Sequence, residues 1–327
     1  MLKAIKTRLY PNQIQQTYIN QLLGSSRYVY NKCLNFKSLE YELWNNPTGI
    51  KDTGKFLLEL KQNNPWLKDS HSKVLQQSLI NLETAFKNFF KKTSNYPTLK
   101  SKHHNQSCRF PVDAISGIKG NRINIIKALW DIHFKCSSKD MSYLNKNQSL
   151  IKSGTLSKTK SGNYYFSILI DKPNKELNKP NNYITGIDVG IKNFIIGSEG
   201  AVYENLKFKR SNQSKLNKLH KSLSRKQKGS SNRTKAKIRL AWFYEKLNNQ
   251  KEYYLHSIIN QLLNDNQIIV IEDLNVSGMM KNHKLAKSIQ ELSLNKFKTM
   301  LEYKASWYGR EVIKIDRFYP SSSYDVS

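Results

Sequence analysis

The sequence predicts a mixed α/β protein in which a β-rich region with a helical insertion precedes an α/β region. Three observations support this prediction. Apolar residues recur at helical spacing between residues 12 and 92, short β-rich runs broken by glycine fill 96–180, and strands alternate with helices from residue 183 onward. The 327 residues are enough for roughly two or three domains with a proper core.

The N-terminal elements are expected to be one strand and a layer of helices. Residues 2–10 alternate as a strand does, with Ile5 and Leu9 on one face. A helix is expected to start after Asn12 and to end at Gly24. A second helix should run through 27–31, and a longer one should begin with Ser72 as its N-cap. The apolar stripe of this longer helix is Leu75, Leu79, Leu82, Phe86 and Phe89.

The β-rich region is expected to pair with the N-terminal strand. Residues 154–158 and 164–170 flank a Lys-Ser-Gly-Asn turn and predict a hairpin. A barrel interrupted by the helical insertion is the economical arrangement of these strands. Pro173, Pro180 and the pair Asn181-Asn182 indicate a linker.

The α/β region should contain a partly parallel sheet, because its strands alternate with helices. Strands are expected at 183–190, 193–197, 201–208, 267–272 and 311–317, with a helix near 286–308.

The charge of the chain indicates a polyanionic partner. Lys and Arg number 54 against 24 Asp and Glu, for a formal net charge of +30. A codon bias toward Lys would not by itself remove acids, and the basic residues are clustered. Such an excess favours nucleic acid over a membrane surface as the partner.

Composition also excludes several classes of protein. No apolar run approaches the roughly 20 residues of a membrane span, and the N-terminus has no apolar signal core, so a cytoplasmic protein is expected. Cys33, Cys108 and Cys136 are far apart and form no Cys-x-x-Cys pair. Neither a disulfide framework nor a zinc site is therefore predicted.

One basic segment stands out. Residues 207–240 hold thirteen Lys or Arg residues and no acid, and two leucine-rich stripes around Gly229 predict a helical hairpin. A solvated face is the usual explanation of a charge run, but 34 residues without a compensating acid favour nucleic-acid contact. The predicted contact residues are Lys209, Arg210, Lys215, Lys218, Lys221, Arg225, Lys226, Lys228, Arg233 and Lys235.

A candidate metal ligand lies in the stretch 185–194. Asp188 is expected to be buried between Gly186 and Gly190, at the end of an apolar run. Glycine weakens a strand, so the pair indicates that something approaches the backbone closely, such as a metal ion or a phosphate ester. A structural turn would also use glycine, but it would not need an acid between apolar neighbours.

The second candidate ligand is Glu272. Residues 268–271 before it are apolar on both faces of the strand, which places the strand inside a sheet. Ligands gather at the carboxyl ends of strands in open α/β sheets, and a buried carboxylate needs a cation or a proton. Taken alone, Glu272 would be an ordinary strand-end acid. Asp273 is expected on the opposite face, where it would cap the next turn.

Together, Asp188 and Glu272 have the character of Mg²⁺ ligands. Mg²⁺ prefers hard oxygen donors, and sites with two ions about 3.5–4 Å apart can activate water and stabilise a leaving oxygen. Such sites normally use three or more carboxylates, of which two stand at convincing positions here.

Several motifs occur in a fixed order along the chain, and together they are specific for one protein family. They are Arg8-Leu-Tyr-Pro-Asn12, Arg27-Tyr-Val-Tyr-Asn-Lys32, Gly186-Ile-Asp-Val-Gly-Ile-Lys192, Leu223-Ser-Arg-Lys-Gln-Lys228, Val270-Ile-Glu-Asp-Leu-Asn-Val276, Asn282-His-Lys-Leu-Ala-Lys-Ser-Ile289, Leu301-Glu-Tyr-Lys-Ala-Ser-Trp-Tyr-Gly309 and Asp316-Arg-Phe-Tyr-Pro-Ser-Ser322. Through these motifs the chain resembles the TnpB (insertion-sequence OrfB) family of transposon-associated, RuvC-like, RNA-guided nucleases, which is related to type V CRISPR effectors.

The resemblance implies the following domains. They are a wedge-like β-barrel (1–10 and 96–180), a helical recognition insertion (11–95), an RNase H-like RuvC domain (181–320) with the basic helical hairpin 209–262, and an irregular tail (321–327). It also implies that a guide RNA pairs with double-stranded target DNA, which the RuvC acids cut. Asp188 would be the first metal ligand and Glu272 the second, with Mg²⁺ as cofactor. The basic residues between them would hold the guide or heteroduplex backbone.

The chain departs from the family pattern after residue 320. In the family a Cys-x-x-Cys zinc ribbon and a third catalytic aspartate follow, whereas no cysteine lies beyond Cys136 here. The chain thus resembles a C-terminally truncated member without the ribbon. Asp316 is a poor replacement for the third acid because it belongs to the preceding strand motif, and Asp325 stands in a short tail.

These departures predict weak or absent cleavage and leave alternatives open. One alternative is a nuclease-dead, RNA-guided DNA-binding regulator. A lower-ranked one is an actin-like ATPase, since Asp-x-Gly strands also cradle phosphates in that fold. The ATPase alternative requires further glycine-rich phosphate loops, which the basic hairpin does not offer.

Overall fold

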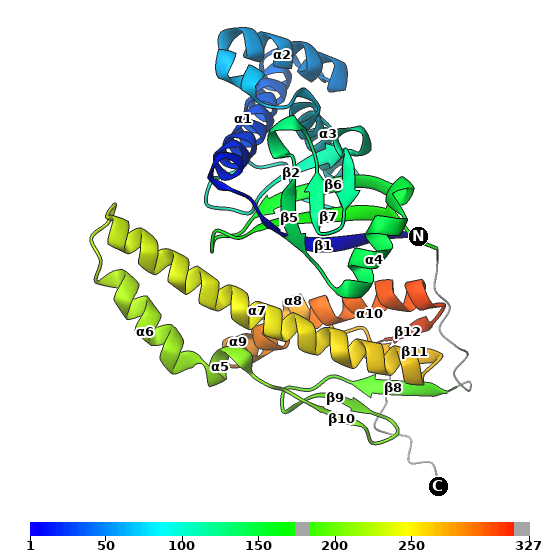
Figure 1. The fold of residues 1–327 in the computed structure, drawn as a ribbon. Helices are drawn as coiled ribbons and strands as arrows, with labels where there is room; N and C mark the ends of the chain where they lie inside the picture. Colours follow the sequence, from blue (N-terminus) through cyan, green and yellow to red (C-terminus); the bar gives the residue numbers. More distant parts are fainter. Residues whose placement is uncertain (174–182, 317–327) are drawn as a thin grey trace. The chain divides into compact units, whose positions relative to one another are not determined.

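The computed structural model describes residues 1–173 and 183–316, and it confirms the mixed α/β class. The chain divides into a first unit, Leu2–Lys172, and a second unit, Pro173–Ser327 with Met1. Each unit has its own β-sheet and helices (Figure 1). The expected linker residues Pro180, Asn181 and Asn182 and the tail 321–327 lie outside the described residues.

The first unit is built on a seven-stranded sheet in the order β2-β6-β7-β1-β5-β4-β3, with every pair antiparallel. Its strands are β1 (Leu2–Tyr10), β2 (Gln106–Pro111), β3 (Gly117–Lys119), β4 (Arg122–Asn124), β5 (Ile132–Lys135), β6 (Ile151–Lys158) and β7 (Tyr164–Asp171). The expected N-terminal strand is confirmed, with its partners supplied by the downstream region. The described pairings run from β2 at one edge to β3 at the other, so closure into a barrel stays a prediction.

The predicted β6–β7 hairpin is confirmed and shows why a glycine lies in β6. Gly154 is paired between Phe110 of β2 and Ile168 of β7. A Cβ atom at Gly154 would lie 2.1 Å from the ring of Phe166, which is fully buried. The absence of a side chain at Gly154 therefore lets an aromatic ring occupy the centre of this core.

The helices of the first unit are longer and more numerous than expected. They are α1 (Gln13–Trp44), α2 (Ile50–Asn63), α3 (Ser72–Phe90) and α4 (Ser138–Lys146), with short 3₁₀ turns at Pro65–Asp69, Val112–Ala114, Lys127–Leu129 and Gln148–Leu150. Asn12 caps α1 as predicted, because its side chain accepts from the Gln15 backbone N–H at 2.9 Å.

Three expectations about these helices are wrong. Gly24 does not end a helix but lies inside α1, because buried apolar residues on both sides of it outweigh a glycine cost of about 1 kcal/mol. Ser72 is the first residue of α3, whose N-cap is His71. The separate second helix expected through 27–31 is part of α1, which continues to Trp44 because Val29, Tyr30 and Cys33 are buried along it. The helices α2 and α4 were not predicted.

The second unit contains a five-stranded sheet in the order β10-β9-β8-β11-β12. Its strands are β8 (Ile184–Asp188), β9 (Asn193–Gly197), β10 (Val202–Glu204), β11 (Ile268–Glu272) and β12 (Glu311–Ile315). β8, β11 and β12 pair in parallel, whereas β8–β9 and β9–β10 are antiparallel. The predicted partly parallel sheet is therefore confirmed.

The helices of the second unit are α5 (Phe208–Ser211), α6 (Gln213–Ser224), α7 (Ser231–Asp265), α8 (Val276–Met279), α9 (His283–Leu292) and α10 (Leu294–Tyr308). The single helix expected near 286–308 is two helices, because Ser293 adopts a left-handed conformation with φ 55°. The C-terminal half of α7 and α10 lie on the same side of the sheet (Figure 1). Their buried residues, including Ile259, Phe297 and Leu301, form one core with Ile187 and Ile271.

None of the helices in the described ranges has both the length and the apolar character needed to cross a membrane.

We predict that Gly154→Ala lowers the free energy of unfolding, because the new methyl group would collide with the Phe166 ring. Overpacking of a tight core typically costs about 1–3 kcal/mol. Gly24→Ala is the matched control, since nothing lies within 4 Å of a Cβ atom added there. Alanine in a helix interior is favoured over glycine by about 0.5–1 kcal/mol. Urea unfolding should therefore shift in opposite directions in the two variants, and equal shifts would contradict this packing.

Candidate metal and nucleic-acid site

The two predicted acids lie side by side at the carboxyl ends of β8 and β11. In this parallel pair Gly186 is opposite Val270, and Ile187 is opposite Ile271. The paired residues end there, and the same register continued by one residue brings Asp188 and Glu272 to neighbouring positions on the same face of the sheet. Neighbouring strands are about 4.8 Å apart, so both carboxylates can reach one cation.

The expectation that Asp188 is buried is wrong. Asp188 is exposed and Glu272 is half-buried. The face of β8 that the helices cover holds Thr185 and Ile187, which are both buried, and strand alternation places Asp188 on the other face. The exposed Asp188 carboxylate is accessible to a cation from solvent.

Of the two glycines beside Asp188, Gly190 has a structural explanation and Gly186 has none in its surroundings. A Cβ atom at Gly190 would lie 3.0 Å from the Asn193 carbonyl oxygen, so this glycine permits the tight connection to β9. A Cβ atom at Gly186 would meet nothing closer than Ser198 Cβ at 3.9 Å. The Gly186 backbone N–H donates to Ser198 Oγ at 3.1 Å. Neither glycine therefore demonstrates a bound ligand.

The segment after Glu272 is held by its neighbours. The Asp273 backbone N–H donates to the Ile315 carbonyl at 2.9 Å, and its carboxylate pairs with the Lys298 ammonium. The expectation that Asp273 caps the next turn is wrong, because Asn275 caps α8 by accepting from the Gly278 N–H at 2.9 Å. These contacts fix the backbone that carries Glu272.

A third acid does not join the pair in the described ranges. Glu272 is opposite Ile315 in β12, so strand alternation directs Asp316 to the opposite face. Asp325 lies outside the described residues. Within 1–173 and 183–316, no three His, Cys, Asp or Glu side chains are grouped to hold a metal. The two adjoining carboxylates nevertheless match the preference of Mg²⁺ for oxygen donors.

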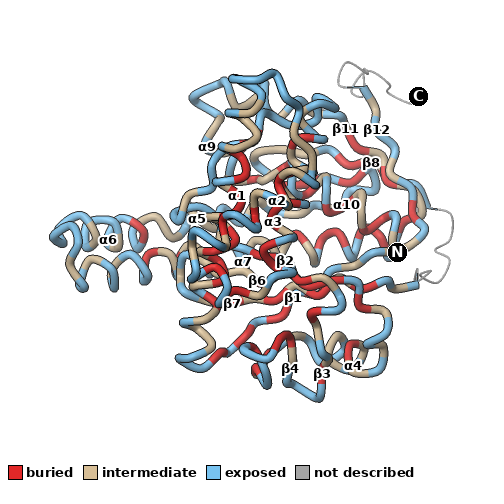
Figure 2. The backbone as a smooth tube through the Cα atoms, turned by 90° about the horizontal axis from the view of Figure 1, so that it is seen from above, coloured by how far each residue is buried: buried red, intermediate tan, exposed pale blue. Residues whose placement is uncertain are grey.

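The basic helical hairpin is formed by α6 and α7, which are antiparallel and joined by 225–230 (Figure 1). The leucine stripes predicted from sequence form its core: Leu216, Leu240, Phe243 and Leu247 are buried together, with Leu219 and Leu223 partly buried. This core is small, and most of α6 remains exposed (Figure 2).

Most of the predicted contact residues are exposed on this hairpin. Those exposed are Arg210, Lys215, Lys218, Lys221, Arg225, Lys226, Lys228 and Lys235. Lys218, Lys221, Arg225 and Lys226 line a shallow hollow on α6 together with Ser222. Four cations around one hollow form a surface that attracts a polyanion.

Arg233 differs from the other predicted contact residues. Its guanidinium Nη1 donates to the carbonyl oxygens of Leu223 and Lys226, each at 2.9 Å. The Leu223 carbonyl lies in the last turn of α6, and the Lys226 carbonyl lies in the connection that follows. Cationic side chains near a helix C-terminus commonly donate hydrogen bonds to such carbonyls, which have no partner within the helix. The structure therefore assigns Arg233 a part in closing the hairpin turn.

Lys209 lies at a junction between the hairpin and α9. The backbone N–H groups of Lys209 and Arg210 donate to Glu291 Oε1 at 2.9 and 3.0 Å. Lys251 of α7 reaches the same place, because its ammonium donates to the Glu291 carbonyl oxygen. Burial, followed by the positive charge of Lys209, lowers the pKa of Lys251 to about 8.

Sequence reasoning missed a stripe of exposed side chains along α7. Trp242 is 51% exposed and Tyr253 is 78% exposed. They follow the helical spacing of the exposed cations Lys235, Arg239 and Lys246. The alternation of cations and exposed aromatic rings at three- and four-residue spacing was readable from sequence, and such a stripe suits a nucleic-acid backbone and its bases.

We predict that Arg233→Met destabilises the hairpin turn, because two carbonyl groups lose a charged donor. Hydrogen bonds to charged groups typically contribute about 1.5–3 kcal/mol. Lys235→Met is the matched control, since its side chain is exposed on the same turn of α7. Hydrogen exchange at the end of α6 should accelerate in Arg233→Met only. The assignment is wrong if Arg233→Met leaves exchange unchanged and weakens nucleic-acid binding as much as Lys235→Met does.

Lys251 should make stability depend on alkaline pH. Its pKa is lower in the folded protein than in the unfolded chain, so the unfolded chain binds more protons between about pH 8 and pH 10.5. The contribution of Lys251 to the free energy of unfolding therefore increases with pH between about pH 8 and pH 10.5. Lys251→Met removes this contribution, so its stability relative to the wild type should be highest near pH 7 and should fall toward pH 10. A difference that is constant with pH, measured by urea unfolding, would contradict the assignment.

Three protein families match segments of this chain. A family described as "Probable transposase" matches residues 167–283, which contain both acids and the basic hairpin. A family described as "Helix-turn-helix domain" matches residues 1–44, which here form one strand and one continuous helix. A family described as "Cas12f1-like, TNB domain" matches residues 295–324.

Two relatives match almost the whole chain. A protein of Streptomyces pristinaespiralis, named "Putative RNA-guided DNA endonuclease", is 30% identical over 322 residues, covering 98% of this chain and 79% of the relative. The protein of Escherichia coli (strain K12) named "Putative RNA-guided DNA endonuclease InsQ" is 30% identical over 339 residues, covering 98% of this chain and 82% of the relative.

A solved structure shares the fold. The protein in "Cryo-EM structure of the Cas12f1-sgRNA-target DNA complex" aligns with a TM-score of 0.55 and 13% identity, covering 94% of this chain and 74% of that chain. The likeness at this identity is one of fold. On the strength of the relatives matched over nearly its full length, the chain belongs to the TnpB (insertion-sequence OrfB) family.

Proposed function

We propose that this protein is an RNA-guided DNA-binding protein whose second unit carries a RuvC-like, Mg²⁺-dependent DNA endonuclease site. The observation that carries this proposal is the adjacency of Asp188 and Glu272 at the carboxyl ends of two parallel strands. Relatives named as RNA-guided DNA endonucleases support the same activity. Membership of this family also argues against the actin-like ATPase alternative.

The finer architecture belongs to the same proposal. We assign the RNase H-like RuvC domain to 181–320, because the central strand β8 and its parallel neighbour β11 carry the two acids. We assign the wedge-like barrel to 1–10 and 96–180, and the recognition insertion to 11–95. In sequence β1 precedes the helical layer, whereas β5 and β7 follow it. The pairing of β1 with both of these strands supports this division.

Asp188 and Glu272 are the residues that would hold Mg²⁺. When bound, the ion supplies positive charge for an attacking water and for the leaving oxygen of a phosphodiester. The contacts of Asp273 with Lys298 and Ile315 keep Glu272 at the strand end. These two carboxylates would supply part of the oxygen ligand set that Mg²⁺ prefers.

The basic hairpin would hold the guide RNA or its heteroduplex with DNA. Its four-cation hollow on α6 and the stripe of α7 with Trp242 and Tyr253 suit phosphates and exposed bases. In this arrangement, base pairing reads the sequence and the protein reads backbone shape and charge.

A second candidate function is a nuclease-dead, RNA-guided DNA-binding regulator. It is favoured by the geometry of Asp316, which strand alternation directs away from Glu272. The presence of both Asp188 and Glu272 in one register favours the nuclease.

We predict that the purified protein carries a discrete RNA and cuts matched DNA in the presence of Mg²⁺. Asp188→Ala should reduce cutting by at least about 100-fold, because one of the two ligands is lost, while RNA binding is retained. Asp316→Asn is the matched control, since strand alternation after Ile315 directs its side chain to the opposite face, and it should cut as the wild type does.

Each outcome of this experiment is decisive. Recovery of no discrete RNA would contradict both guided functions. RNA-directed DNA binding without cutting at any Mg²⁺ concentration would favour the regulator. Equal cutting by Asp188→Ala and the wild type would show that the acid pair is not the catalytic site.

A further inference from the structure

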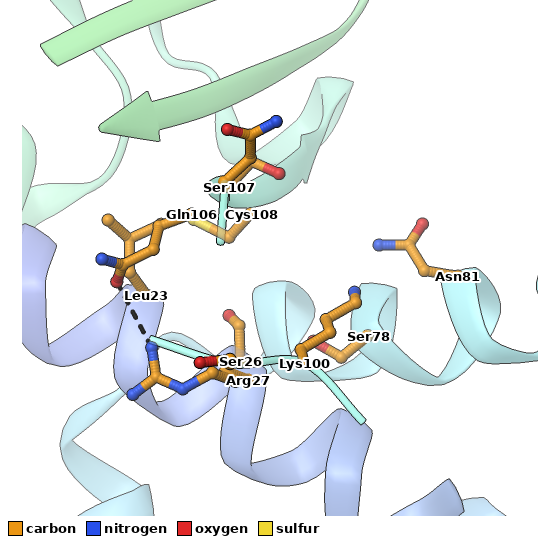
Figure 3. A pocket seen from close by; sticks show the side chains of 11 residues that line it. Leu23, Ser26, Arg27, Ser78, Asn81, Lys100, Gln106, Ser107 and Cys108 are labelled. Carbon is orange, nitrogen blue, oxygen red and sulfur yellow. Dashed lines mark hydrogen bonds between the residues drawn. The ribbon is translucent and has the colours of Figure 1, made fainter. Parts of the chain in front are cut away.

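A polar pocket in the first unit has no part in the function proposed so far. It lies between α1, α3 and the chain leading into β2 (Figure 3). Its lining includes Arg27 and Ser26 from α1, Ser78 and Asn81 from α3, and Lys100 from the loop. The motif that contains Arg27 carried part of the family resemblance, and the acid pair and the hairpin leave it unexplained.

The lining of this pocket has cationic and hydrogen-bond-donating side chains but no acidic ones. Two cationic side chains, Arg27 and Lys100, stand among serine hydroxyls and asparagine and glutamine amides, and no acid contributes to the wall. Hydroxyl, amide and guanidinium groups together can all donate hydrogen bonds to one acceptor-rich group. Such a wall suits an anion with several oxygen acceptors.

One buried hydroxyl in the pocket has no partner. Ser26 is 5% exposed, and its Oγ atom is buried without a hydrogen-bond partner among the described residues. An unsatisfied buried hydroxyl typically costs about 1–3 kcal/mol, so its retention needs an explanation. Figure 3 shows Ser26 between Arg27 and Lys100, where a bound anion would accept its hydrogen bond.

The two cations are held in place by neutral partners. The Arg27 guanidinium donates to Gln106 Oε1 at 3.3 Å, a long bond that leaves other donors available. The Lys100 ammonium lies 3.7 Å from the centroid of the Tyr30 ring. The Lys100 backbone is fixed by Asn31, which accepts from its N–H at 2.8 Å and donates to its carbonyl at 2.9 Å. Both positive charges are therefore positioned without being neutralised by a carboxylate.

We propose that this pocket binds one phosphodiester group of a nucleic-acid backbone, with Arg27, Lys100 and Ser26 as its ligands. Its free space corresponds to about one or two water molecules, which suits a phosphate group and is too small for a base. Nucleic acid as the source rests on the proposed function. The phosphate belongs either to the guide RNA or to the target DNA.

The test compares how RNA and DNA affinities of the full chain depend on salt. Affinity for co-purified RNA and, separately, affinity of the RNA-loaded protein for matched duplex DNA are measured from 50 to 300 mM KCl. Lys100→Gln should reduce the slope of log affinity against log salt for one of the two ligands. The loss of one contact lowers this slope by about 0.7 for single strands and about 0.9 for duplex DNA. The ligand that responds identifies the source of the phosphate.

Lys102→Gln is the matched control, because Lys102 is exposed two residues away and does not line the pocket. It removes the same charge and should leave both slopes unchanged. Equal slope changes in Lys100→Gln and Lys102→Gln would mean general charge attraction and would overturn the pocket proposal. Unchanged slopes in both variants would overturn it as well.

Ser26→Ala provides a second, independent variant. Because the hydroxyl has no partner, its removal should leave the thermal midpoint unchanged or raise it, while binding of the responding ligand weakens several-fold. Unchanged affinity in Ser26→Ala would overturn the role of this hydroxyl. If the wild type binds neither nucleic acid, the proposed function fails. If it binds both and these variants bind equally well, only the pocket proposal fails.

Discussion

The parallel pairing of β8 with β11 is the constraint on which the candidate site depends. Register in a sheet is set by the side-chain pattern of each strand, and a slip of one residue would move every side chain to the other face. Here Ile187 and Ile271 share the buried core with Phe297 and Leu301 of α10. The free energy that buries these residues also fixes Asp188 beside Glu272. The acids are thus positioned by the packing of their apolar neighbours.

Repulsion between like charges is the second constraint. In the basic hairpin, the packing of a small apolar core between α6 and α7 opposes this repulsion. Leu216, Leu240, Phe243 and Leu247 hold two helices together while their outer faces carry an excess of cations. Arg233 directs its charge inward, onto the carbonyls that end α6 and its turn, and the Lys215 ammonium lies 4.8 Å from the centroid of the Phe243 ring. A polyanion bound outside would relieve the repulsion that this core opposes.

Helices and strands with a clear periodicity of apolar residues were predictable from sequence. Features that depend on packing against other parts of the chain were not. The alternation in residues 2–10 and the apolar run in 268–271 gave the strands correctly, because burial of one or both faces dictates these patterns. Gly24 was misread as a helix end, since only packing on both sides shows that the helix continues.

The placement of the two candidate acids was more predictable than their environment. Sequence indicated acids at the ends of two strands, and the register of Ile187 with Ile271 agrees with that placement, whereas their role as a metal site stays a prediction. Their exposure was not predictable, because it depends on which face the helices cover. The pocket around Ser26 could not be predicted from sequence either, since its residues come from segments up to 85 positions apart (23 to 108) that only the fold brings together.

The central claim is that Asp188 and Glu272 act together as one cation site. Isothermal titration with Mn²⁺, a Mg²⁺ substitute, tests this in the wild type, Asp188→Asn, Glu272→Gln and the double variant. If the two carboxylates share one ion, each single variant should lose most of the binding, and the double variant should lose little more. Losses that add independently, or binding that survives in both single variants, would contradict the account.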